Sequence, residues 1–418
     1  MTRLGPALCV LAMAGTVVVT CAGTASAAPA TVIRVPQDEK TIQDAVDASK
    51  PGTLVLVSPG VYKEAVTVTA AHKNIVIRGV NRETTILDGE FRDERGHEDG
   101  FKVLADGVAI ENITARNYTE NGFFWTGVLG YRGSYLTAYR NGDYGIYAFA
   151  SQWGQFDHSY ASGSPDAGFY IGQCFPCNAE ITDSEAAYNG IGYSGTNAGG
   201  NLIIKDSVWH DNRIGIVPNS GDGEKLAPEH ETTIVGNLVY RNNNSKSPAI
   251  DAAKLGEYNG ILIGVGNDNL VIRNRVHDHR IGGIVIVPNP DTTLWVSNGN
   301  RVEDNVVTKS AIGDLASAGG DGNCFVGNTF RTSKPADIEQ TMPCTGTGIP
   351  AVDPFDIGPF LEAKKPPSVD YRQAKTPPPP KLPGMPHAKT AKARPANHIV
   401  IDVDLASVKM PKLPARLR

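Results

Sequence analysis

A repeat of short apolar segments, each introduced by a glycine, constrains the fold of this 418-residue chain more than any other feature. Successive intervals between these glycines are 23, 23, 22, 25, 45 and 22 residues. Most steps therefore share one period, and the long step is one period that contains inserted loops. The glycines are Gly122, Gly145, Gly168, Gly190, Gly215, Gly260 and Gly282.

Each period also contains a second short alternating segment, such as VAIENITARN, LIIKDSVWHDN, TTIVGNLVYRNN or NLVIRNRVHDH. Glycine, asparagine and aspartate separate the segments, and these residues tolerate the left-handed backbone of tight turns. Short strands of successive turns can then stack about 4.8 Å apart, pair in parallel and bury their Ile, Leu and Val side chains. The pattern predicts an all-β fold, a single-stranded right-handed parallel β-helix (a solenoid), over residues 74–332.

The segment before the solenoid predicts a cap. TIQDAVDASKPGTLVLVSPGVYKEAVTV, at Thr41 to Val68, begins with a helix N-cap threonine and continues as a short amphipathic helix, a Pro-Gly turn and a strand. We therefore assign residues 29–73 to an N-terminal cap and first strands, because a solenoid needs its open first turn covered.

This cap, together with NIVIRGVNRETTILDG at Asn74 to Gly89, resembles the pectin-lyase-like superfamily of right-handed parallel β-helix proteins. The resemblance covers roughly Thr31 to Arg331 and implies a scaffold that serves many activities on polysaccharides. The motifs of pectin methylesterases, polygalacturonases and pectate lyases have no counterpart in the chain. PDAG, at Pro165 to Gly168, is a poor substitute for the DPHD motif of mannuronan epimerases. No specific enzyme family is matched, and the chain is either non-enzymatic or a polysaccharide lyase, glycoside hydrolase or epimerase.

The first 28 residues have the pattern of a secretory signal peptide: an early Arg3, an apolar run and small residues ending at Ala27. We expect a secreted protein, associated with the cell wall in one interpretation, without a transmembrane segment.

The cysteines beyond the signal are expected to form disulfides, and sequence proximity favours Cys174 with Cys177 and Cys324 with Cys344. A redox or metal-binding role for CFPC is the alternative.

Residues 333–418 form a proline-rich basic tail. From Pro350 onward lie 14 of the 28 prolines, and from Ala363 onward 12 Lys or Arg accompany 3 Asp. Such a segment carries little apolar surface, so we expect it to be mostly disordered, with a strand only at His398 to Val408. The tail either contacts anionic wall polymers or is simply solvated.

Two nearly identical turns, HDNR and HDHR, supply the candidate catalytic residues. Histidine suits acid–base catalysis and arginine suits binding of a uronate carboxylate. Polar side chains are also what a solvated turn accepts, which is the competing interpretation. The candidates are His210, Asp211, Arg213, Asp278, His279 and Arg280.

Aromatic residues in the early turns and two long insertions are the candidate substrate-binding elements. Sugar rings stack on aromatic faces, and loops inserted on one side of a solenoid commonly shape its binding cleft. The insertions are Ser220 to Glu231 and Asn243 to Tyr258, and the candidate substrate contacts are Trp125, Tyr147, Tyr170 and Glu231.

No cofactor is certain. The acidic loop Phe91 to Gly100 makes calcium an option, although it lacks the ordered ligand spacing of an EF-hand. His277 and His279 could begin a copper or zinc site.

The leading hypothesis from the sequence is a secreted, monomeric protein that binds an extracellular polysaccharide, with cleavage or epimerisation as its candidate reactions. Nucleic acid is not an expected partner. The alternatives are a non-enzymatic adhesion or protein-binding module of the cell wall and, as a minor one, a metal-handling exported protein.

Overall fold

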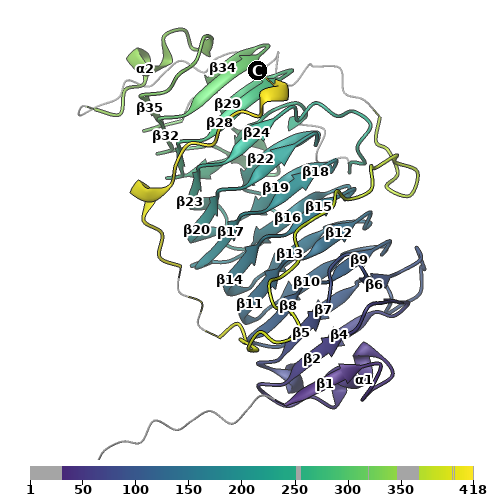
Figure 1. The fold of residues 1–418 in the computed structure, drawn as a ribbon. Coiled ribbons are helices and arrows are strands. Elements are labelled where there is room, and N and C mark those ends of the chain that lie inside the picture. Colours follow the sequence, from purple (N-terminus) through teal and green to yellow (C-terminus); the bar gives the residue numbers. More distant parts are fainter. Residues whose placement is uncertain are drawn as a thin grey trace, which may run out of the picture.

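The computed structural model describes residues 31–250, 256–318, 320–345, 367–397, 399 and 401–417. Within them the chain winds into stacked turns, and most turns contribute one strand to each of three parallel sheets (Figure 1). The predicted right-handed parallel β-helix is confirmed. The predicted signal peptide, residues 1–28, lies outside the described residues.

Sheet A contains β1 (Val32–Val35), β2 (Leu54–Val57), β5 (Val76–Gly79), β8 (Val108–Glu111), β11 (Leu129–Ser134), β14 (Gln152–Asp157), β17 (Ala179–Thr182), β20 (Gly199–Lys205), β23 (Glu229–Val235), β26 (Gly266–Asn267), β27 (Leu270–Ile272), β32 (Arg301–Glu303) and β35 (Cys324–Val326). Sheet B contains β3 (Gly60–Tyr62), β6 (Thr85–Asp88), β9 (Thr114–Arg116), β12 (Thr137–Tyr139), β15 (Tyr160–Ser162), β18 (Glu185–Ala187), β21 (Val208–His210), β24 (Leu238–Tyr240), β28 (Arg275–His279) and β33 (Val306–Ser310). Sheet C contains β4 (Val66–Val68), β7 (Phe101–Val103), β10 (Phe123–Thr126), β13 (Ile146–Phe149), β16 (Ala167–Gly172), β19 (Ile191–Thr196), β22 (Ile214–Asn219), β25 (Ile261–Gly264), β29 (Gly282–Val287), β34 (Gly313–Ser317) and β36 (Ser333–Lys334).

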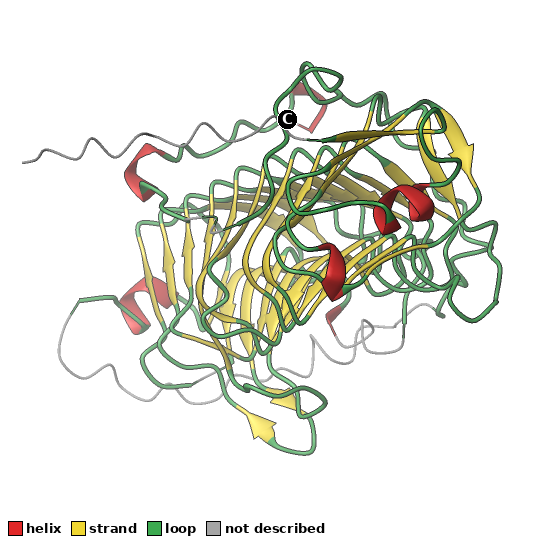
Figure 2. Cartoon of the chain, turned by 90° about the horizontal axis from the view of Figure 1, so that it is seen from below, coloured by secondary structure: helices red, strands yellow, loops and turns green. Residues whose placement is uncertain are grey.

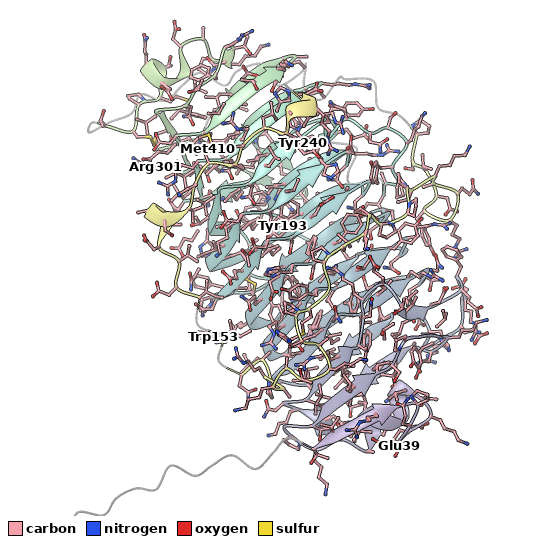
Figure 3. The ribbon with its side chains drawn as sticks, viewed as in Figure 1. Glu39, Trp153, Tyr193, Tyr240, Arg301 and Met410 are labelled. Atoms are coloured by element: carbon pink, nitrogen blue, oxygen red, sulfur yellow. A yellow bond between two sulfur atoms is a disulfide. The ribbon has the colours of Figure 1, made fainter. Side chains whose placement is uncertain are left out.

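The three sheets enclose one continuous apolar core. Figure 2 shows the strands of successive turns stacked side by side, and the buried apolar side chains fill the space between the sheets. Inward positions stack in register, for example Phe123 on Ile146 and Ile146 on Phe169. Tyr193, labelled near the middle of Figure 3, is fully buried among them. Because each turn buries its apolar face only against its neighbours, the fold depends on stacking of consecutive turns.

The repeated glycines are required by close backbone approach between turns. A Cβ atom on Gly145 would lie 2.6 Å from the carbonyl oxygen of Gly168, and one on Gly122 would lie 2.7 Å from that of Gly145. The left-handed turn positions are mostly occupied by other residues. Two stacked series of them flank sheet B, one containing Asn112, Tyr135 and His158 and the other containing Asn117, Arg140, Tyr188, Asp211, Arg241, Asp278 and Lys309.

Buried asparagines form hydrogen-bonded ladders beside these turns. Asn189 donates to Asn212 over 3.0 Å, and Asn212 donates to Asn242 over 3.0 Å. The side-chain amide of Asn242 in turn lies 3.2 Å from Nε2 of His279. A second ladder joins Asn237, Asn274, Asn305 and Asn328. The ladders satisfy backbone and side-chain polar groups that each turn would otherwise bury without partners.

Both ends of the solenoid are covered. The predicted capping helix is α1 (Ile42–Asp47), whose N-cap Thr41 accepts a hydrogen bond from the amide of Asp44 and which buries Ile42, Ala45 and Val46. At the other end lies α2 (Ile338–Thr341), which buries Ile338. The remaining elements are the hairpin of β30 (Asn289–Pro290) and β31 (Leu294–Trp295) and the 3₁₀ turns η1 (Ala70–His72), η3 (Leu405–Ser407) and η4 (Ala415–Leu417). Among the described ranges, no helix has the length and apolar character needed to cross a bilayer.

Both predicted disulfides are present. Cys174 and Cys177 join across one turn, and Cys324 and Cys344 join β35 to the segment after α2. The sulfur-bearing residues of the first pair are almost completely buried. This placement favours the structural role over redox or metal chemistry for CFPC, because a catalytic thiol pair needs access to its partner.

The C-terminal segment differs in part from the disordered tail that we expected. Residues 346–366 lie outside the described residues, but residues 367–397 and 401–417, here called the strap, lie along the solenoid (yellow in Figure 1). Arginines of successive turns donate hydrogen bonds to strap carbonyls. These are Arg213 to Pro367, Arg140 to Arg372, Arg82 to Pro383, Arg78 to Ala391, Arg132 to Arg394, Arg273 to Leu405 and Arg275 to Pro411.

Apolar strap residues also pack on two of the three sheets. Ile401 and Val408 bury against Ile203, Val235 and Ile272 on the outside of sheet A. Leu417 buries against Leu238 and Tyr240 on the outside of sheet B, where Figure 3 labels Tyr240 and, in the strap, Met410. The segment that we expected as a strand, His398 to Val408, forms no strand in its described residues. Its alternation instead places Ile399, Ile401 and Val403 on the sheet, so composition underestimated what an existing surface can order.

Candidate functional site

The outer surface of sheet C carries a tier of large side chains in register. Lys102 of β7 pairs with Phe124 of β10, Phe124 pairs with Tyr147 of β13, and Tyr147 pairs with Tyr170 of β16. The rings of Phe124 and Tyr147 stack with centroids 4.5 Å apart, and the Lys102 amine lies 5.6 Å from the Phe124 centroid. Because parallel strands repeat the same side-chain position in each turn, one sequence period generates the whole tier.

Acidic residues occupy the turns that lead from sheet B into sheet C, beside this tier. The backbone amide of Asp143 donates to the carbonyl of Glu120, and that of Asp166 donates to the carbonyl of Asp143, so these residues stack on consecutive turns. Tyr144 bridges the two features: its hydroxyl donates to Asp166 over 2.7 Å and its ring lies 4.3 Å from that of Tyr147.

The first insertion, Ser220 to Glu231, places a further carboxylate, that of Glu224, over the outer surface of sheet C. Its loop folds back over sheet C, where the amide of Lys225 donates to Gln173 over 2.8 Å and the hydroxyl of Tyr170 donates to Oε1 of Glu224 over 2.5 Å. The other oxygen, Oε2 of Glu224, is buried and has no hydrogen-bond partner among the described residues. A protonated Glu224 therefore holds an unshared proton inside the site.

The environment raises the carboxyl pKa values unequally. Burial, with added repulsion from Asp166, Glu120 and Asp99, raises the pKa of Asp143 to about 7. Burial raises the pKa of Asp166 to about 6, with the hydrogen bond from Tyr144 acting in the opposite direction. Burial and then the charge of Asp166 raise the pKa of Glu224 to about 7. All three carboxyl groups therefore hold a proton at a higher pH than an exposed Asp or Glu does, which suits a general acid.

Tyr147 lies at the centre of the cluster. Burial raises the pKa of its hydroxyl, and the charges of Glu224, Asp143, Asp166 and Asp99 raise it further. Tyr147 is half-buried. We call Asp143, Tyr144, Tyr147, Asp166, Tyr170 and Glu224 the carboxylate–tyrosine cluster.

This cluster occupies the one sheet face that the described part of the strap leaves uncovered. The strap packs on sheets A and B. The second insertion covers the later turns of sheet C, where Ala249 and Tyr258 bury against Ile191, Ile214 and Leu262. Between these coverings Phe124 of β10 and Tyr147 of β13 stay partly exposed, whereas β16 is buried, with Tyr170 beneath Glu224.

The predicted substrate contacts divide between surface and interior. Tyr147 and Tyr170 belong to the cluster, although Tyr170 is almost completely buried beneath Glu224. Trp125 is fully buried, with its ring centroid 5.5 Å from that of Phe156 in the core, so the prediction that Trp125 contacts substrate is wrong. Trp125 lies between Phe124 and Thr126 on β10. Because consecutive residues of a strand face opposite sides of the sheet, Trp125 points into the core while its two neighbours point outward. Glu231 is exposed on sheet A, away from the cluster.

The two His-Asp turns do not form one catalytic group. Asp211 and Asp278 hold equivalent left-handed turn positions, and Asn212 and His279 belong to one buried ladder. Burial lowers the pKa of His279 to about 3, so it is a neutral hydrogen-bond acceptor in the core. Arg213 is fully buried and pairs with Glu257 over 2.6 Å. Arg213 and His279 therefore hold the fold together, which corrects their assignment as catalytic residues.

Of the other candidates of these turns, His210 is buried, Asp211 and Asp278 are half-buried, and Arg280 is exposed. His210 contacts Asp211 over 2.7 Å and Glu185 over 3.0 Å, and stacks on Tyr240 at 4.7 Å. Burial opposes protonation of His210, but those carboxylates raise its pKa overall. A depression of about 390 Å³ is lined by Tyr188, Asp211, Arg241, Asn243, Asn244 and Asp278. Arg280 is exposed and covers the ring of Tyr258 at 5.4 Å. A catalytic role for His210, Asp211, Asp278 and Arg280 stays a prediction.

Sequence reasoning missed Asp143 and Asp166 as site residues. Each precedes one of the repeated glycines by two residues, in DYG and DAG. That spacing, together with Glu120 in ENG one period earlier, was the available signal. It indicates a stacked row of carboxylates on one edge of a solenoid.

Metal ligands are not gathered in this structure. Among the described residues, no group of three or more His, Cys, Asp or Glu side chains is arranged to hold a metal ion. Calcium binding by the loop Phe91 to Gly100, and copper or zinc binding by His277 and His279, stay predictions.

Comparison with known proteins concerns the solenoid. A family model described as right handed beta helix region matches residues 121–330. The A-module of mannuronan C-5 epimerase AlgE4 from Azotobacter vinelandii has a similar structure, with a TM-score of 0.51, 16% identity, and coverage of 70% of this chain and 90% of that one. An alginate lyase from Paenibacillus gives a TM-score of 0.44 at 13% identity, covering 72% of this chain and 99% of that one. At these identities the likeness concerns the fold alone. No curated protein matches the chain.

Proposed function

The chain belongs to the right-handed β-helix family, and from that premise we propose that it binds a polysaccharide across β10, β13 and β16 and hydrolyses it with the carboxylate–tyrosine cluster. The observation that carries the proposal is the position of Glu224. Its Oε1 is held by Tyr170, its buried Oε2 has no partner among the described residues, and its pKa of about 7 keeps it protonated at mildly acidic pH.

Glycoside hydrolysis needs one protonated and one ionised carboxyl group beside the scissile bond. Glu224 suits the general acid. Asp166, with a pKa of about 6, suits the ionised partner, and the Tyr144 hydroxyl stabilises its charge. Asp143, with a pKa of about 7, contributes to the electrostatic environment of both. The Phe124 and Tyr147 rings supply a platform on which a sugar ring can stack.

The charge of the site favours a neutral glycan over a uronate polymer. Asp99, Glu120, Asp143, Asp166 and Glu224 surround the tier, with Lys102 as the cation in register with it. Lyases and epimerases of uronates must neutralise a substrate carboxylate, and the carboxyl groups of this cluster, neutral or ionised, do not supply the cation that this needs. The solved neighbour named as a mannuronan epimerase therefore supports a polysaccharide ligand without fixing its charge.

A panel of polysaccharides tests the proposal. Neutral glucans, mannans and xylans and the uronates alginate and pectate are incubated with the protein, while reducing ends and unsaturated products are measured. We expect new reducing ends from a neutral polymer, with activity greatest between about pH 6 and 7, where Asp166 is ionised and Glu224 still protonated.

Glu224→Gln is expected to lower kcat by about 100-fold or more, because loss of a general acid typically costs that much. Glu231→Gln, which changes an exposed carboxylate on sheet A, is the matched control and should retain wild-type activity. Detection of unsaturated products would show that the protein cleaves by a lyase mechanism and not by hydrolysis. Absence of both binding and turnover across the panel would refute the proposal.

We also propose that the protein acts outside the cell, supported by its two disulfides and by the signal-like first 28 residues.

A further inference from the structure

A cavity lies on sheet B, near the C-terminal end of the solenoid and far along the chain from the carboxylate–tyrosine cluster. Its volume is about 410 Å³, comparable to the space that a small ligand occupies. Two parts of the chain enclose it: the last turns of the solenoid and the end of the strap. The lining residues are Arg275, His277, Thr308, Lys309, Ser310, Asp314, Arg331, Thr332, Leu413 and Leu417.

The cations of this cavity come from successive turns. Arg275 lies on β28, Lys309 on β33, and Arg331 follows in the next turn. Arg275 is oriented by the strap, because its Nε donates to the carbonyl of Pro411 over 2.7 Å. Lys309 and Arg331 are exposed. These side chains can therefore direct positive charge toward a ligand without loss of a core contact.

Asp314, the acidic residue of the cavity, is hydrogen bonded to backbone amides. Asp314 is almost completely buried, and its two oxygens accept hydrogen bonds from the amides of Ser310 and Arg331, each over 2.9 Å. It stabilises the turn and leaves three cationic side chains lining the cavity against one carboxylate. The described lining of the cavity therefore has an excess of positive charge.

His277 lines the cavity beside these cations. Burial lowers the pKa of its imidazole, and the positive charges of Lys309 and Arg275 lower it further. Its Nδ1 lies 2.8 Å from the hydroxyl of Thr308. The wall thus combines neutral hydrogen-bonding groups with cations, while Leu413 and Leu417 provide an apolar side.

We propose that this cavity binds an anionic, sugar-sized ligand through a phosphate or carboxylate group held by Arg275, Lys309 and Arg331. Oxyanions are the natural partners of cations that line one cavity. The hydroxyl and apolar lining suits the carbon skeleton that carries the anion. This ligand differs in charge from the neutral glycan proposed for sheet C, and the two sites face different sides of the solenoid.

The test uses the full-length protein and calorimetric titration with inorganic phosphate, glycerol 1-phosphate, glucuronate and glucose at low ionic strength. We expect the anions to bind and glucose not to bind. Tighter binding of the two phosphates would identify phosphate as the recognised group, whereas tighter binding of glucuronate would identify carboxylate. Failure of all three anions to bind would overturn the proposal.

The double variant Lys309→Ala/Arg331→Ala is expected to weaken anion binding by at least about 10-fold, since each charge-assisted hydrogen bond contributes on that scale. The matched control, Lys50→Ala/Lys73→Ala, removes two exposed cations near the N-terminal end and should bind like the wild type. Equal weakening in both variants would contradict a defined site, because it would reflect net charge alone. Turnover of a polysaccharide should be unchanged in the cavity variant, which separates this proposal from the one for sheet C.

Discussion

At the scale of single residues, burial decides which polar groups support the fold and which remain available for chemistry. Glu229 is fully buried in β23 and hydrogen bonds to Thr232 over 2.6 Å and Asn269 over 2.8 Å. Burial raises its pKa to about 8, although both hydrogen bonds act in the opposite direction. Glu229 is therefore a neutral acid inside the core over most of the physiological range.

This raised pKa predicts that stability falls as the pH rises from about 4.5 to about 8. Below pH 4.5, the pKa of this group in the unfolded chain, the Glu229 carboxyl is protonated in both the folded and the unfolded state, and its contribution to stability is fully present. This contribution is lost as the pH rises through about 8, because the unfolded chain releases the proton at a lower pH than the folded protein does. Glu229→Gln should remove this dependence, flattening the fall in the free energy of unfolding between pH 5 and 8 by roughly 2–4 kcal/mol.

Chemical denaturation at several pH values measures the effect. Glu231→Gln, an exposed carboxylate two residues along the same strand, is the control and should keep the wild-type slope. A Glu229→Gln protein whose stability declines with pH like the wild type would show that other groups dominate the titration.

At the scale of elements, the strap is the least expected part of the molecule. It has almost no regular secondary structure and is held by arginine-to-carbonyl hydrogen bonds and by apolar side chains that insert onto sheets A and B. Proline restricts its backbone before folding, so less conformational entropy is lost when it docks. The basic residues, which suggested a solvated tail, belong to this strap and therefore lie along the surface of the solenoid.

Ile401→Ser is expected to loosen the strap. Ile401 is almost completely buried on sheet A with Ile203, Val235 and Ile272, so the substitution should lower the free energy of unfolding by about 1–3 kcal/mol. Thermal unfolding and limited proteolysis measure it, with earlier cleavage expected within residues 367–417. Asp402→Ser changes the exposed neighbour and should behave like the wild type; identical proteolysis of both variants would mean that the arginine contacts alone hold the strap.

At the scale of the whole molecule, the solenoid presents three long faces that differ in what covers them. The strap covers much of sheets A and B, the second insertion covers the later turns of sheet C, and the carboxylate–tyrosine cluster lies on the remaining face. A ligand on that face should leave the other faces unchanged.

Hydrogen exchange with a bound oligosaccharide tests this arrangement. We expect slower exchange in β10, β13, β16 and the loop from Ser220 to Pro228, and no change in the strap. The Glu224→Gln protein, which should still bind, allows the measurement without turnover. Protection centred on β21, β24 and β28 instead would move the binding site to the His-Asp turns.

The architecture could be predicted because its cause is local and repeated. Gly122, Gly145 and Gly168 recur at one period, and each turn contacts mainly the next, so a one-dimensional pattern determines a stack of turns. The capping helix and the two disulfides followed from equally local signals. The site could not be predicted in the same way: Phe124 and Trp125 are adjacent aromatics, yet one faces outward and the other is core.

The sequence by itself determined the period and the cap and favoured the pairing of cysteines, because these depend on residues close together in the chain. Only the tertiary structure decided that Arg213 and His279 of the two His-Asp turns are buried, that Glu224 reaches Tyr170 across 54 positions, and that the tail docks on two sheets. Those outcomes depend on which surfaces remain uncovered once the turns have stacked. Burial and long-range contact, which set the carboxyl pKa values, arise only at that stage.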